Sequence, residues 1–207
     1  MSLHAVVESS RALRKHFDEN KSISASLYIR HYRDISGMLS GLGMVFSFVT
    51  KDIDSKICIL ETHLEKRDTE TLDDIVLFEV KNKCTNTKKP KSAARTLLRL
   101  HRALEFIHHF IERLHALEPS DSAVPAAQEA YRHTLSQYHS WMIRQTVQVA
   151  LRTLDNKDAL LLRVTKTEDR PHKHVEPNAI RMLCEDLRRI WEHVQTMFDE
   201  HDLHGLP

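Results

Sequence analysis

The chain has little glycine and proline: of its 207 residues four are Gly, six are Pro, and aromatic residues make up 6%. This composition leaves little material for the turns and strands of a β-sandwich or barrel and favours a helical protein. The chain also lacks an excess charge of either sign, because 30 Lys and Arg face 29 Asp and Glu, for a net charge of +1. A general nucleic-acid-binding protein is strongly basic. Any anion that this protein recognises must therefore be held by a local cluster of cations.

Cysteine pairs and long apolar runs are missing as well. The three cysteines, Cys58, Cys84 and Cys184, form no C-x-x-C pair, and we expect free thiols in a reducing compartment. No stretch approaches the roughly 18 apolar residues that cross a bilayer, and residues 1–17 show no continuous apolar run of the kind found in signal peptides. The sequence therefore predicts a soluble, cytoplasmic protein.

The six prolines fall where helices should begin or stop, and long stretches with helical apolar spacing run between them. Short polar linkers join these stretches, and no internal repeat is present. We therefore predict one all-α domain over residues 1–207. The expected helices lie near 3–18, 24–34, 36–66, 70–82, 91–117, 122–154, 157–164 and 177–203.

The expected helix at 91–117 is apolar on most of its circumference, which predicts a central position in the domain. Its main apolar face consists of Leu97, Leu100, Leu104, Ile107, Ile111 and Leu114. A second row, across the axis, consists of Arg95, Arg99, Arg102, Phe106 and Phe110. The narrow strip left for solvent consists of His101, Glu105, His108, Glu112 and His115.

The second row, three arginines followed by two phenyl rings, has two interpretations. One is a solvated basic end followed by core aromatic residues. The other is a pocket with a cationic mouth and an apolar interior. Neighbouring like charges on a helix repel each other, so the arginines need a nearby anion, and the planar guanidinium can bond two phosphate oxygens at once. The row alone leaves both interpretations open.

Two further features are ambiguous by themselves. Asp52 and Lys56 are spaced i,i+4 beside an apolar stripe on the helix expected at 36–66, which is also the spacing of an ordinary surface ion pair. His139 heads a line with Ile143, Val147 and Leu154 on the helix expected at 122–154. A lone histidine on such a face is usually a core residue.

The combination resembles a known family. The segments VTKDIDSKICIL, ARTLLRLHRALEFIHHF and QYHSWMIRQ, with their motifs D-x-x-x-K, R-x-x-x-R-L-x-R and Y-H-x-W, occur in this order and resemble the glycolipid transfer protein superfamily. The resemblance implies a two-layer, all-α fold that encloses a hydrophobic pocket and carries one sphingolipid between membranes. It covers the chain from about Leu27 to its last residues.

The residues at the headgroup positions indicate the branch. Superfamily members that carry neutral glycolipids have Asn where this chain has Lys56 and Trp where it has Arg99, so the two cations resemble the ceramide-1-phosphate branch. That resemblance implies that Lys56, Arg95 and Arg99 hold the phosphate. It further implies that Asp52 accepts hydrogen bonds from the sphingoid amide and hydroxyl groups and that His139 donates to the acyl carbonyl. Arg102 fits the motif, but no ligand contact is assigned to it.

The resemblance also implies a lining for the lipid chains and a surface for membrane docking. Trp141 follows His139 by two residues, about 200° around a helix, and matches a docking tryptophan of the family; core packing is the alternative. The expected hydrophobic lining consists of Phe46, Val49, Ile53, Phe106, Phe110, Ile143, Val147 and Leu154.

We therefore expect a monomeric carrier of a ceramide-1-phosphate-like lipid that contacts membranes transiently and needs no metal, cofactor or nucleic acid. The alternatives are a sphingolipid sensor or scaffold acting through a protein partner, and a carrier of a neutral glycosphingolipid. We do not expect an enzyme, because no G-x-S-x-G or H-E-x-x-H motif is present. The two E-x-x-H units share one helix, whereas a di-iron bundle places them on two.

Overall fold

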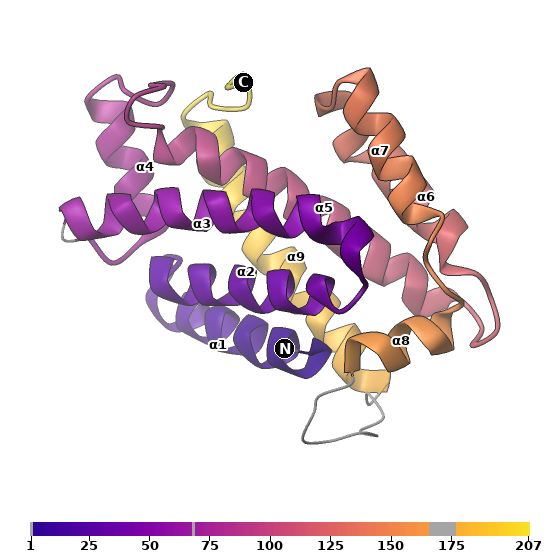
Figure 1. The fold of residues 1–207 in the computed structure, drawn as a ribbon. Coiled ribbons are helices and arrows are strands. Elements are labelled where there is room, and N and C mark those ends of the chain that lie inside the picture. The colour runs from indigo at the N-terminus through magenta and orange to yellow at the C-terminus, as the bar shows by residue number, and fades with distance from the viewer. Residues whose placement is uncertain (1, 68, 166–176) are drawn as a thin grey trace.

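The computed structural model describes residues 2–67, 69–165 and 177–207, and these residues form helices and turns but no strands (Figure 1). Residues 166–176, part of an expected polar linker, lie outside this description. The all-α class is therefore confirmed. The α-helices are α1 (Leu3–Asn20), α2 (Ala25–Ser40), α3 (Ser47–Arg67), α4 (Leu72–Lys81), α5 (Ala93–Ala116), α6 (Ala123–His133), α7 (Trp141–Leu151), α8 (Lys157–Thr165) and α9 (Pro177–Glu200), and two short 3₁₀ helices are η1 (Met44–Phe46) and η2 (Leu135–Tyr138).

The helices form two layers, and α5 runs through the centre of the second. Helices α1, α2 and α3 lie side by side, and α5 and α9 pack behind them (Figure 1). Helix α6 packs on α5 and leads into α7. Together α6 and α7 form an arm at the right of the view (Figure 1). The predicted central position of the helix at 91–117 is confirmed, because α5 contacts α3, α4, α6 and α9.

The apolar face predicted for α5 is found, but the predicted solvent strip is exposed only at Glu112 and His115, and Glu105 and His108 are half-buried. Leu97, Leu100 and Leu104 are buried, as the apolar spacing predicts. His101, expected in the solvent strip, is buried instead: its ring stacks on Trp191 of α9 at 5.3 Å between centroids, and its Nε2 lies 2.9 Å from Oε1 of Gln195. The expectation was wrong because α9 covers this end of the strip, which the periodicity of α5 alone does not reveal.

The helix expected at 36–66 is broken near its start. Helix α2 continues to Ser40, a turn follows, and α3 begins only at Ser47. Gly43 has a φ of 104°, a backbone conformation that glycine adopts without a steric penalty. No right-handed helix can pass through this residue, so the boundary at 36 was wrong, as was the end of the preceding helix at 34.

The helix expected at 122–154 is three separate pieces, α6, η2 and α7. The helical backbone ends at Thr134, whose hydroxyl donates to the carbonyl of Ala130. Ser140 starts a new helix, because its Oγ accepts a hydrogen bond from the N–H of Ile143. His139 therefore lies in extended backbone before α7, and the helical angle expected between His139 and Trp141 does not apply.

The other five expected helices agree with the structure to within three residues at each end. No helix in the described parts of the chain is both long and apolar enough to span a bilayer.

Candidate functional site

A cavity of about 620 Å³ lies between α3 and α5 on one side and α7 and α8 on the other. This volume is within the range of about 300–1,000 Å³ found for small-molecule sites. All eight residues expected to form a hydrophobic lining border this cavity, namely Phe46, Val49, Ile53, Phe106, Phe110, Ile143, Val147 and Leu154. The phenyl rings of Phe106 and Phe110, one turn apart on α5, stack at 6.2 Å.

Four of the five polar residues expected at the headgroup border the same cavity, namely Asp52, Lys56, Arg99 and His139. Lys56 forms an ion pair with Asp52, and the two side chains differ sharply in exposure: that of Lys56 is 11% exposed and that of Asp52 is 67% exposed. The charged end of Lys56 therefore lies below the surface, where an anion would be attracted more strongly than in bulk water.

Arg95, the fifth, does not border the cavity. It lies one turn before Arg99 on α5, and its Nε donates a hydrogen bond of 2.9 Å to the main-chain oxygen of Pro207. Arg102 borders the cavity and donates to the main-chain oxygen of His204, also at 2.9 Å. The segment after α9 thus lies along the row of arginines, where it accepts from two of them.

The arginines of the row have little compensating negative charge around them. Burial is the main reason why the pKa of the Arg102 guanidinium is lowered. The charge of Arg99 lowers it further, and Tyr138 and the half-buried Glu105 offset only part of the decrease. Apart from the ion pair between Asp52 and Lys56, no carboxylate of the described residues forms an ion pair with this group of cations. The mouth of the cavity is therefore suited to a negatively charged ligand group.

His139 joins the site through a contact that the sequence did not indicate. Its Nδ1 lies 2.9 Å from the hydroxyl of Tyr131, a residue of α6 that is 1% exposed. Burial lowers the pKa of His139, partly offset by the charge of Asp52. The imidazole is therefore neutral at neutral pH and has a single N–H to donate.

Tyr131 and Tyr138 both border the cavity. Sequence reasoning missed Tyr131, and it gave Tyr138 no role although this residue opens the Y-H-x-W motif. Tyr138 precedes His139, and the guanidinium carbon of Arg102 lies 3.8 Å from the centre of its ring. No spacing rule could have found Tyr131, because α6 ends at Thr134 and the helical spacing does not continue from Tyr131 to His139.

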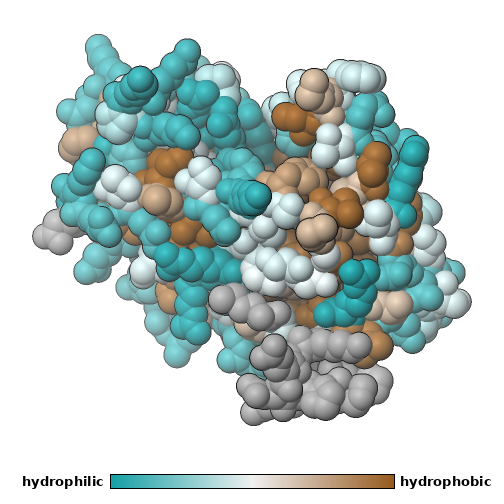
Figure 2. Space-filling model, in the orientation of Figure 1, coloured by the Kyte–Doolittle hydropathy of each residue, from teal (hydrophilic) through white to brown (hydrophobic). Residues whose placement is uncertain are grey.

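Trp141 lies outside the cavity and is 69% exposed. Met142, next to it, and Met44 and Val45 of η1 are also exposed, although all are apolar. Figure 2 shows apolar surface on the side where the start of α3 faces α7. The sequence GLG followed by MVF could have predicted the exposure of Met44 and Val45, because two glycines there interrupt the helix just before three apolar residues.

Among the residues that the structure describes, one group of side chains could hold a metal. The ligand atoms of His108, His109 and Glu112, on α5, lie within 4.8 Å of one another. None of the three borders the cavity, so they have no part in the site described here. That the protein needs no metal stays a prediction.

The glycolipid transfer protein (GLTP) family matches residues 23–166 of this chain. The chain is 34% identical to the ceramide-1-phosphate transfer protein of Mus musculus over 195 residues, 87% of this chain and 86% of the relative. It is 32% identical to that of Homo sapiens over 203 residues, with 92% and 90% covered. The crystal structure of the human protein in complex with 12:0 ceramide-1-phosphate superimposes with a TM-score of 0.85 at 28% identity, covering 100% of this chain and 99% of the other. The chain therefore belongs to the glycolipid transfer protein family, and within it the chain is similar to the ceramide-1-phosphate transfer proteins.

Proposed function

We propose that this protein, as a single domain, binds one ceramide-1-phosphate-like sphingolipid and transfers it between membranes. The observation that carries the proposal is the position of Lys56 and Arg99 at the mouth of an apolar cavity. The relatives named above are ceramide-1-phosphate transfer proteins, which supports the same ligand class.

The phosphate of the ligand is held by Lys56, Arg95 and Arg99. A phosphomonoester carries a charge of roughly −1.5 to −2 near neutral pH, which these cations neutralise. Arg95 has further guanidinium donors besides the Nε that bonds Pro207. A neutral sugar headgroup would offer no anion to Arg95 and Arg99, so it would lack the charge-assisted hydrogen bonds that a phosphate forms with them.

The ceramide group is bound by Asp52 and His139. The carboxylate of Asp52 accepts from the amide N–H and hydroxyl of the sphingoid base, and the imidazole of His139 donates to the acyl carbonyl. The hydrocarbon chains occupy the apolar part of the cavity, beyond Phe106 and Phe110. Each methylene removed from water contributes about 0.8 kcal/mol.

Loading and release take place at a membrane surface. Trp141, Met142, Met44 and Val45 are exposed on the elements that flank the cavity, and tryptophan is favoured at the interface between lipid and water. We place these side chains in the bilayer surface during docking, with the protein in the cytoplasm between encounters. No covalent bond is made or broken, and the concentration difference between the two membranes drives net transfer.

The test is transfer between vesicles of fluorescent ceramide-1-phosphate and fluorescent galactosylceramide, measured side by side with the purified protein. We expect the phosphate lipid to move and the galactolipid to remain. Transfer of the galactolipid alone would contradict the assignment of the cationic residues to a phosphate. Saturable binding of ceramide-1-phosphate without transfer would indicate that the protein is a sensor and not a carrier. If neither lipid binds, the proposal is refuted.

A further inference from the structure

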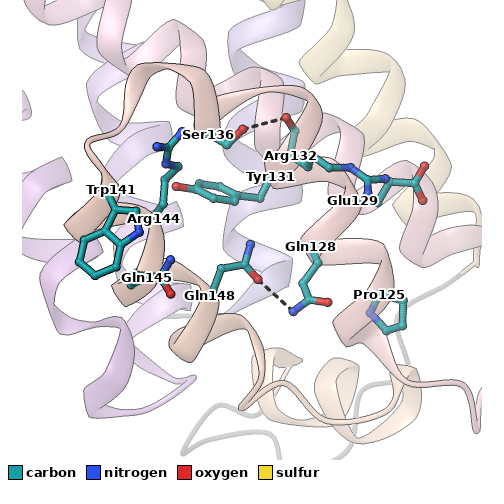
Figure 3. A pocket seen from close by; sticks show the side chains of 10 residues that line it. All are labelled: Pro125, Gln128, Glu129, Tyr131, Arg132, Ser136, Trp141, Arg144, Gln145 and Gln148. Carbon is teal, nitrogen blue, oxygen red and sulfur yellow. Dashed lines mark hydrogen bonds between the residues drawn. The ribbon is translucent and has the colours of Figure 1, made fainter.

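Tyr131 separates two hollows of the molecule. One is the cavity described above, and the other is an outer groove of about 700 Å³ between α6 and α7. Figure 3 shows this groove, with the ring of Tyr131 between the two helices and the guanidinium of Arg144 beside its hydroxyl end. The Tyr131 side chain therefore has the cavity and His139 on one side and Arg144 on the other.

The ring of Tyr131 is held in place from several directions. It packs edge-on against Phe106, with the centroids 6.4 Å apart, and it lies 5.7 Å from the ring of His139. Its hydroxyl is 2.9 Å from Nδ1 of His139 and has no other hydrogen-bond partner among the residues that the structure describes. The orientation of the imidazole therefore depends on this one phenol.

The position of the proton in this hydrogen bond decides what His139 can do. If the phenol donates, Nδ1 has no proton, and the single proton of the neutral ring is on Nε2. If Nδ1–H donates to the phenol oxygen instead, Nε2 presents a lone pair, which would repel a carbonyl oxygen.

Arg144 favours the first arrangement. A guanidinium group has no acceptor, so the phenol proton cannot be given to it. The positive charge beside the phenol oxygen orients the O–H bond away from Arg144, and the acceptor on the other side is Nδ1 of His139. Burial raises the pKa of the Tyr131 hydroxyl, and the charge of Arg144 partly offsets that increase.

We propose that Tyr131 is a positioning residue that holds His139 as the Nε2–H tautomer and so presents one donor to the carbonyl of the bound lipid. This rests on the proposed function insofar as the acceptor is the acyl carbonyl of a ceramide-based ligand. Tyr131 itself does not contact that carbonyl, because it acts through His139.

The test compares Tyr131→Phe with the wild-type chain by ¹⁵N NMR of histidine-labelled protein and by vesicle transfer. The signals of His139 are assigned by their loss in His139→Leu. In the wild type we expect a non-protonated Nδ1 and a protonated Nε2, and in Tyr131→Phe a mixture of tautomers. Transfer and binding of ceramide-1-phosphate should fall about three- to tenfold, the effect of one neutral hydrogen bond.

The matched control is Tyr28→Phe. Tyr28 is as deeply buried as Tyr131, but its hydroxyl has no hydrogen-bond partner in the described residues and it does not border the cavity. Both variants lose one buried phenolic hydroxyl, so a fall in transfer that appears in both would indicate a general structural effect. The control should leave the tautomer of His139 and the transfer rate unchanged.

Two results would overturn the proposal: a wild-type His139 protonated on Nδ1, or a Tyr131→Phe protein with unchanged tautomer and transfer. The wild-type spectrum, assigned with His139→Leu, needs no ligand and does not depend on Tyr131→Phe, so it decides the tautomer even if Tyr131→Phe does not fold. If the wild type transfers no ceramide-1-phosphate, the proposed function fails. If the wild type and Tyr131→Phe transfer it equally well, the function stands and the role of Tyr131 fails.

Discussion

The guanidinium of Arg102 on α5 lies over the ring of Tyr138 on η2, with 3.8 Å between the guanidinium carbon and the ring centre. Arg102 also donates to the main-chain oxygen of His204. One side chain thus joins α5 to the segment that carries His139 and to the segment after α9. The shape of the polar end of the cavity depends on this junction.

The pair is expected to be coupled in stability. Arg102→Met and Tyr138→Leu should each lower the free energy of unfolding, and the double variant should lose about 0.5–1 kcal/mol less than the sum of the two, the value of an exposed cation–π contact. Urea unfolding of the four proteins measures this coupling. Strict additivity would show that the contact contributes nothing in solution.

Arg99→Leu should abolish transfer of the phosphate lipid without unfolding the protein. Arg99 is exposed at the cavity mouth, and a hydrogen bond to a charged group contributes roughly 1.5–3 kcal/mol, so we expect at least about a tenfold loss of affinity. The control is Arg30→Leu, an exposed arginine of α2 that does not border the cavity. Normal ceramide-1-phosphate transfer by Arg99→Leu would refute the headgroup assignment.

Trp141→Ala should weaken attachment to vesicles while leaving the cavity intact. The indole is 69% exposed and does not border the cavity. Its loss removes apolar area worth on the order of 1–2 kcal/mol at a bilayer surface, or roughly tenfold in partitioning. Sedimentation with vesicles measures attachment, and binding of a short-chain ceramide-1-phosphate in the absence of vesicles should be unchanged. If vesicle attachment and lipid binding fall equally, Trp141 instead contributes to the packing around the cavity.

Glu79 of α4 should be among the most costly residues to remove. Its buried carboxylate accepts from the Ser92 hydroxyl at 2.7 Å and from the N–H groups of Ala93 and Ala94 at 2.8 and 3.0 Å, and it lies 3.6 Å from Arg67. It therefore caps the start of α5, and Glu79→Ala leaves these donors and a cation unpaired, at a cost of about 3–5 kcal/mol.

Urea unfolding at neutral pH measures the loss in Glu79→Ala. The exposed Glu112, on α5, provides the comparison, since Glu112→Ala should change stability by no more than about 0.5 kcal/mol. Similar small values for both variants would show that water replaces the carboxylate of Glu79 at the helix end.

The protein should lose stability between about pH 6.5 and pH 4. Burial lowers the pKa of His31 and of His101 from 6.5 to about 4. Below pH 6.5 the unfolded chain binds protons that the folded protein does not, so the free energy of unfolding falls until the folded pKa is reached. Each group contributes up to about 3 kcal/mol. His31→Gln, which does not titrate, should show a smaller decrease in urea unfolding at pH 4.5 than the wild type; an identical decrease would show that His31 titrates normally.

Local features were predictable from the sequence alone. The 3.6-residue periodicity of α5 places Arg95, Arg99 and Arg102 in one row with Phe106 and Phe110, and this row needs no knowledge of any other helix. The resemblance to the family added the other site residues, and four of the five polar residues and all eight apolar residues that it implied border one cavity. The spacing within a helix determines the positions in the row of α5, because neighbours at i+3 and i+4 share a face whatever the helix packs against.

Only the tertiary structure decided which segments meet. The end of α6 at Thr134 and the new start at Ser140 turn the chain so that His139 approaches Tyr131, eight residues earlier. The packing of α9 buries His101 and brings the main-chain oxygens of His204 and Pro207 to the arginines of α5. Such contacts depend on how helices pack and where loops turn, and the periodicity of a single helix contains no information about its neighbours.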